Sequence, residues 1–100
     1  MTLVMNDPVQ YQFRLFVAGD TSNSLQAITN LRALCTAHLP DRHAIEIVDV
    51  FREPLRALAD GVFMTPTLVK LGPLPEQRIV GTLSQLPVVL QALGLGGIAA

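Results

Sequence analysis

The sequence contains one cysteine and no tryptophan, and only 15% of its 100 residues are charged. A single cysteine excludes an internal disulfide and a metal site made of cysteines. The formal net charge of −1 gives no electrostatic support for nucleic-acid binding. No apolar run approaches the ~18 residues that a membrane span needs, and residues 1–10 lack the basic flank and apolar core of a signal peptide. We therefore expect a cytoplasmic protein with no nucleic-acid or membrane partner.

Hydrophobic residues, in contrast, make up 50% of the chain, which has the length of one domain with one core. This large share predicts a well-filled core or a surface shared with other chains, and a homo-oligomer (dimer or tetramer) is an open alternative. We expect residues 1–10 to be a flexible lead-in, residues 11–95 to form the domain and residues 96–100 to be a disordered tail.

Hydrophobic periodicity and turn residues predict strands and helices in the order βαβαββα. Strands are expected at residues 11–17, 44–50, 67–71 and 77–81, and helices at residues 24–39, 54–60 and 85–93. The first strand, helix and second strand form a βαβ unit, which predicts parallel pairing, and the short connection between the last two strands predicts antiparallel pairing. The order is that of an α/β thioredoxin-like sandwich with a mixed four-stranded sheet.

Three local features complete this prediction. Short polar side chains offer N-caps for the first and last helices, at Asp20, Thr21, Ser22, Asn23 and Ser84. The buried face of the first helix is expected at Leu25, Ile28, Leu31, Leu34, Cys35 and Leu39. The third strand is entered through the Thr65-Pro66 bond, which can be cis and would then fix the backbone beside a binding site.

The residues that a thioredoxin-type redox reaction needs are missing. That reaction requires a thiolate at the N-terminus of the first helix, where the dipole and free amides stabilise it. Residues 20–24 hold no thiol, and Cys35 lies about three turns into the helix on its apolar face, so we expect a core cysteine. His38, His43 and Asp41 could form a weak metal site, but histidines at a helix end are usually surface residues. We predict no catalytic residue, no metal site and no cofactor.

The remaining charged residues allow two interpretations. Those around the short second helix and the following hairpin are Arg52, Glu53, Arg56, Asp60, Lys70 and Arg78. They form either a solvated face or the charged rim of a docking surface, which would tune association rate and partner choice. Asp49, between two valines, is either a partly buried acid or a hydrogen-bond acceptor at the end of a strand.

Four separated segments resemble the KaiB family. They are FVAGDTSNS at 16–24, IVDV at 47–50, MTPTL at 64–68 and IVGTLS at 79–84. The resemblance implies a circadian-clock component without enzymatic activity, which binds the ring-shaped ATPase KaiC and modulates its phosphorylation state. It also implies KaiA, where present, as a further partner and a sensor kinase with a similar domain as a competitor. The family adopts two folds: a usually tetrameric ground state with the order βαββααβ, and the thioredoxin-like state that binds KaiC.

The resemblance also assigns roles to individual residues. We predict partner contacts at Arg52, Arg56, Lys70 and Arg78, of which Lys70 and Arg78 match basic positions of the family. The residues with structural roles in the change of fold are predicted to be Tyr11, Pro66, Pro73, Pro75, Ala92 and Gly94. Ala92 and Gly94 stand where relatives have a Gly-Leu-Asp run. Alanine in place of glycine favours a helix by ~1 kcal/mol, and Gly94 supplies a helix stop. We therefore expect the thioredoxin-like state, with the ground state as the alternative.

Three functions remain open at the level of the sequence. The first is a clock adaptor that docks on a KaiC-type ATPase. The second is a KaiB-like protein that acts through protein–protein contacts in stress or signalling control, outside a clock. The third is a residual thiol-transfer activity through Cys35.

Overall fold

The computed structural model describes residues 10–95. The elements are β1 (Tyr11–Val17), α1 (Ser22–His38), β2 (His43–Asp49), α2 (Pro54–Ala59), β3 (Thr67–Gly72), β4 (Gln77–Val80) and α3 (Leu86–Ala92). They form one mixed sheet with the strand order β2-β1-β3-β4. β1 is parallel to β2, and β3 is antiparallel to both β1 and β4. The predicted thioredoxin-like order is therefore confirmed, together with the direction of each pairing.

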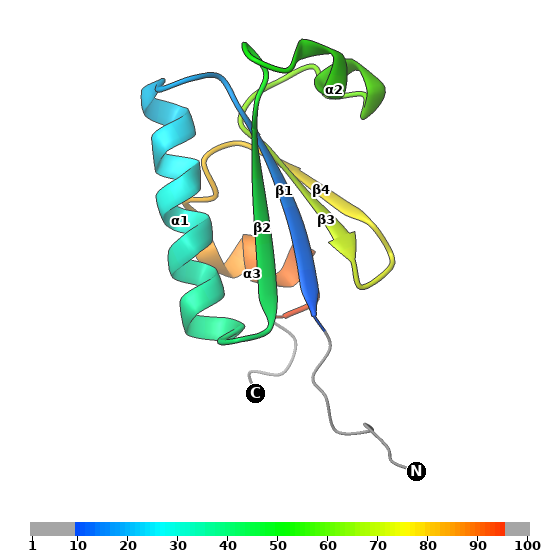
Figure 1. Ribbon diagram of the computed structural model, residues 1–100. Coiled ribbons are helices and arrows are strands. Elements are labelled where there is room, and N and C mark those ends of the chain that lie inside the picture. Colours follow the sequence, from blue (N-terminus) through cyan, green and yellow to red (C-terminus); the bar gives the residue numbers. More distant parts are fainter. Residues whose placement is uncertain (1–9, 96–100) are drawn as a thin grey trace.

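The helices lie on two sides of the sheet (Figure 1). α1 and α3 share one face, where Phe13, Leu15 and Leu68 of the sheet pack with Leu31 and Val89 in the larger core cluster. α2 lies at the end of the sheet where β1 and β2 finish. The smaller cluster, on the other face of the sheet, joins side chains of three strands to α2 and the loop after it: Phe16, Val48, Val69, Ala57 and Val62. The two faces of β1 thus serve two separate cores.

One prediction about α1 is wrong, and another is correct only in position. Leu25 is half exposed, because the buried positions are Ser24, Ala27, Leu31, Leu34 and Cys35, and Leu25 lies one residue away from that stripe. Thr21 is the N-cap but its side chain makes no capping bond. Its hydroxyl donates instead to Ser24 Oγ at 2.8 Å, and Ser24 Oγ also accepts from the Ala18 amide at 3.0 Å. The polar residues therefore tie the end of β1 to the first turn of α1.

The C-terminal part contains the predicted helix, with Pro87 in its first turn. Its N-cap is Gln85 and not the predicted Ser84, whose hydroxyl accepts a hydrogen bond from Thr82 at 3.2 Å. The chain leaves α3 at Gly94, which has a φ of 78°, a conformation that glycine adopts at little cost. A helix rather than a terminal strand after β4 distinguishes the thioredoxin-like arrangement from the family's alternative order, so the expected state is the one observed.

The Thr65-Pro66 bond is cis, the isomer that the sequence pattern permits for it. The Gly72-Pro73 and Leu74-Pro75 bonds in the hairpin between β3 and β4 are also cis, which the sequence pattern does not predict. The expected tail and all but the last residue of the expected lead-in lie outside the described residues. Within residues 10–95, no helix combines the length and apolarity that crossing a membrane requires.

Candidate docking surface

α2 exposes most of its apolar residues. Pro54 begins the helix, where its missing N–H costs little, and Gly61, with a φ of 67°, follows its end. Only Ala57 is buried, whereas Leu55 and Leu58, on one side of the helix by their spacing of three, are 77% and 64% exposed. A helix of this kind presents a hydrophobic ridge to solvent.

The loop from α2 to β3 carries further exposed apolar residues. Phe63 is 84% exposed and Met64 is also exposed, while Val62 between them and the helix is buried and anchors the loop. Thr67 Oγ1 donates a hydrogen bond to the Met64 carbonyl, which holds the loop against the start of β3. A hollow of about 220 Å³ lies between this loop and β4, where Val80 is exposed as well. We call Leu55, Leu58, Phe63, Met64 and Val80 the α2 patch.

Asp49 organises the approach to α2. One carboxylate oxygen accepts hydrogen bonds from the Gly19 amide at 3.1 Å and from the Phe51 amide at 2.9 Å. The ring of Phe51 lies over Gly19, where an added Cβ would stand 3.2 Å from it. Asp49 is therefore the hydrogen-bond acceptor at a strand end, one of the two interpretations that the sequence left open. It sets the position from which the chain enters α2.

A network of ion pairs connects α2 to the sheet. Arg14 of β1 donates to Glu46 of β2 at 2.8 Å and to Asp60 after α2 at 2.9 Å. Arg56 of α2 lies 2.7 Å from the second carboxylate oxygen of Glu46. Hydrogen bonds from Arg56 and then Arg14 lower the pKa of Glu46 to about 2. We call Arg14, Glu46, Arg56 and Asp60 the ion-pair network.

The predicted partner-binding residues do not all lie on this side. Arg52 is exposed and lies 3.9 Å from Asp49, and Arg56 belongs to the ion-pair network. Arg78 donates to the carbonyl oxygens of Asp60 and Gly61 at the end of α2. Arg56 thus lies in α2, Arg78 contacts its end, and Arg52 lies in the connection that precedes it.

Lys70 lies on the opposite face of the hairpin. The register pairs Val69 with Arg78 and Lys70 with Gln77, so Lys70 and Arg78 point to different sides of the sheet. The Lys70 side chain is buried, and its ammonium lies 5.9 Å from the centre of the Tyr11 ring. In this fold Lys70 is separated from the three arginines.

The residues assigned to a change of fold are dispersed. Tyr11 is at the start of β1 and stacks on Phe13 with ring centres 6.1 Å apart. Pro66 is buried before β3, Pro73 and Pro75 lie in the hairpin, and Ala92 and Gly94 lie at the end of α3. Apart from Tyr11, all belong to the second half of the chain. Their role in a change of fold stays a prediction.

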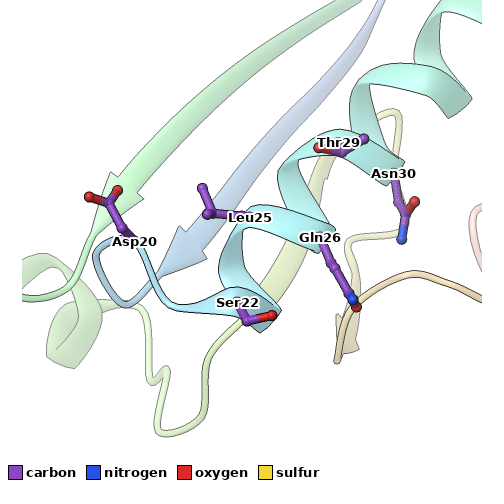
Figure 2. Close-up of a pocket in the computed structure, with 6 residues that line it drawn as sticks. All are labelled: Asp20, Ser22, Leu25, Gln26, Thr29 and Asn30. Carbon is purple, nitrogen blue, oxygen red and sulfur yellow. The ribbon is translucent and has the colours of Figure 1, made fainter.

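A second surface hollow follows the first turns of α1 (Figure 2). It has a volume of about 460 Å³ and is lined by Asp20, Ser22, Leu25, Gln26, Thr29 and Asn30. Asn30 reaches across to donate a hydrogen bond to the Thr82 carbonyl at 2.8 Å, which ties α1 to the connection before α3. The lining contains one carboxylate and neither thiol nor imidazole, so it offers no nucleophile with an adjacent base.

The other candidate reactive groups are structural. Cys35 is fully buried, and burial raises the pKa of its thiol to about 11. The core position that the sequence predicts for it is confirmed. His43 Nδ1 lies 2.7 Å from the Leu39 carbonyl oxygen, and the described residues contain no group of three ligands that could hold a metal ion.

Sequence reasoning missed Arg14, Glu46 and the apolar patch. The signal for the first two was present, because both occupy central positions of adjacent predicted strands and carry opposite charges. The signal for the patch was the pair Leu55 and Leu58 on a helix too short to bury both sides. Both signals become specific only once the register and the layer of α2 are known.

Sequence comparison places the chain among known proteins. The sequence model of the KaiB domain matches residues 14–95. The circadian clock protein KaiB3 of Synechocystis sp. is 40% identical over 82 residues, which are 82% of this chain and 80% of that protein. The circadian clock oscillator protein KaiB of Prochlorococcus marinus is 38% identical over 91 residues, which cover 91% of this chain and 85% of that protein.

Structural comparison supports the same fold. The N-terminal domain of Synechococcus elongatus SasA superposes with a TM-score of 0.73 at 18% identity, and the match covers 95% of this chain and 90% of that domain. Mitochondrial thioredoxin 3 of Saccharomyces cerevisiae gives a TM-score of 0.68 at 18% identity and covers 87% of this chain and 80% of that protein. At this level of identity the similarity concerns the thioredoxin-like fold.

Proposed function

This chain belongs to the KaiB family, and from that membership we propose that it is a clock adaptor that docks on a KaiC-type ATPase. We assign the contact to the α2 patch, with Arg52, Arg56 and Arg78 as its rim. The adaptor would modulate the phosphorylation state of the ATPase by binding, without chemistry of its own.

The observation that carries this proposal is the exposure of large apolar side chains on and after a six-residue helix. Apolar residues scattered singly on a surface are normal, but a group of them marks an interaction site. Their burial contributes roughly 25 cal/mol for each Å² removed from water. Large side chains at the centre of an interface supply most of its binding free energy.

The charges around the patch suit a rim better than a centre. Arg56 and Arg78 already bond to groups of this chain, so a partner gains little from pairing with them. Rim charges act mainly on the association rate and on partner choice. Lys70 lies on the other face of the hairpin, so we leave it out of this contact.

The test is the affinity for the cognate KaiC-type ATPase, measured with ATP, with ADP and without nucleotide. Replacing Leu58→Ser removes an exposed apolar group at no cost to the core, and we expect a loss of affinity of about tenfold, or ~1.4 kcal/mol. The matched control is Val88→Ser, because Val88 is 61% exposed on α3, which lies on the opposite face of the sheet. Absence of binding in every nucleotide state, or equal losses in both variants, would refute the proposal.

A further inference from the structure

The attachment of α2 to the rest of the molecule contains few apolar contacts. A surface helix normally buries three or four apolar residues in two turns, but α2 buries Ala57 alone. Isolated helices of this length are unstable in water. Hydrophobic packing by Ala57 and the following Val62 therefore leaves the orientation of α2 weakly determined.

Polar contacts supply what the packing lacks. Arg56 within α2 pairs with Glu46 at 2.7 Å, and Asp60 at the C-cap pairs with Arg14 at 2.9 Å. Arg14 and Glu46 are direct partners in the register of β1 and β2, and they are joined to each other at 2.8 Å. The network thus holds α2 at its middle and at its end, and both contacts lead to one point on the sheet.

The setting of the network favours a measurable effect. An isolated ion pair at a surface contributes ~0–1 kcal/mol, because both side chains lose entropy and solvent screens the charges. Here the side chains of Arg14 and Asp60 are only 24% and 29% exposed. The guanidinium groups of Arg14 and Arg56 both pair with the Glu46 carboxylate. Ordering one of these side chains therefore helps to order the others. Arg14 also lies on the same face of the sheet as α2, opposite Val69 of β3 in the strand register.

We propose that Arg14 and Glu46 are positioning residues that hold α2 on the sheet and thereby fix the geometry of the docking surface. This inference rests on the proposed function for its consequence in docking, but the effect on α2 is measurable without a partner. Neither residue belongs to the α2 patch. Their loss acts on docking through α2.

The experiment compares Arg14→Met with the wild type by amide hydrogen exchange, followed residue by residue. Methionine keeps an apolar stem over the sheet and removes the charge. We expect exchange at residues 55–61 to accelerate at least about fivefold, the equivalent of ~1 kcal/mol, while the amides of β1 and β3 keep their protection. The matched control is Arg32→Met, because Arg32 is exposed on α1, away from the network.

A second variant separates positioning from general stability. Asp60→Asn removes the negative charge from the Arg14–Asp60 ion pair at its loop end and leaves the central strand intact, so it serves even if Arg14→Met folds poorly. In the wild type, raising the salt to about 1 M, where screening acts within about 3 Å, should accelerate exchange in α2, and in Asp60→Asn it should have a smaller effect. Unchanged exchange in α2, or equal acceleration throughout the molecule, would overturn the inference.

Docking gives the final readout. We expect Arg14→Met to bind the KaiC-type ATPase several-fold more weakly with the α2 patch unchanged, and Arg32→Met to bind as the wild type. If α2 loosens as expected but the wild type binds no such ATPase, the proposed function fails and the positioning role stands. If the wild type binds and a loosened α2 leaves the affinity unchanged, the positioning role in docking is wrong.

Discussion

At the scale of single residues, Cys35 shows how burial decides chemistry. Its thiol is inaccessible, and burial raises its pKa to about 11, so little thiolate forms at neutral pH. We expect Cys35→Ser to lower the free energy of unfolding by about 1–3 kcal/mol, because the hydroxyl loses its water. Urea denaturation measures the loss. A folded Cys35→Ser protein that no longer binds its partner would support a functional thiol.

Glu46 makes the stability depend on acid pH. Hydrogen bonds from Arg56 and Arg14 hold its pKa at about 2, below the ordinary value of 4.5. Because the folded state prefers the ionised form, the stabilisation is complete above about pH 4.5 and is lost as the pH falls towards 2. We expect Glu46→Gln to be less stable than the wild type at pH 7, with the difference narrowing in acid. A difference in the free energy of unfolding that stays constant between about pH 2 and pH 7 would contradict this expectation.

At the scale of elements, hydrophobic periodicity predicted the longer strands and α1, whereas turn residues bounded the short elements: α2 buries only Ala57 and was recognisable from Pro54 and Gly61. Periodicity did not predict which side of α1 is buried at its start. Leu25 fits a helical pattern with Ile28, but the buried residues there are Ser24 and Ala27. Contacts between distant residues were also out of reach. The bond from Arg14 to Asp60 joins residues 46 positions apart, and its formation depends on where the fold places α2.

The end of α3 offers a test at the same scale. Gly94 has a φ of 78°, and a Cβ placed there would meet no neighbour within 4 Å. Gly94→Ala therefore isolates backbone strain, and we expect a loss of about 1–2 kcal/mol in the free energy of unfolding. Gly72→Ala is the control, since Gly72 also has open space around it but no positive φ. Equal stabilities of the two variants would show that the left-handed turn does not restrain α3.

At the scale of the whole molecule, the candidate site was predictable in location but not in character. The sequence directed attention to charged residues around the second helix, and three of the four predicted partner-binding residues lie there. The exposed apolar groups and the burial of Lys70 follow from the thinness of the α2 layer and from strand register. Neither is a property of a local segment.

The proposed change of fold also belongs to this scale. Helix-breaking Ala92→Gly should disfavour α3 by ~1 kcal/mol and raise the population of an alternative fold about fivefold relative to this one. Amide NMR would show two sets of peaks, because the folds exchange slowly, and the set from the alternative fold would be stronger in Ala92→Gly than in the wild type. Ala33→Gly is the control, because Ala33 lies exposed in α1, in the half of the chain that we expect both folds to share. A single set of peaks in both variants would count against two folds.

The seclusion of Cys35 also has a practical consequence for studying the protein. The thiol at position 35 is shielded in the larger core, so a cysteine introduced by Met64→Cys would be the one group that a maleimide dye reaches in the folded chain. Met64 lies in the α2 patch and is 63% exposed, so a fluorophore there would report contact directly. The native chain thus permits optical labelling of its docking surface without prior removal of its own cysteine.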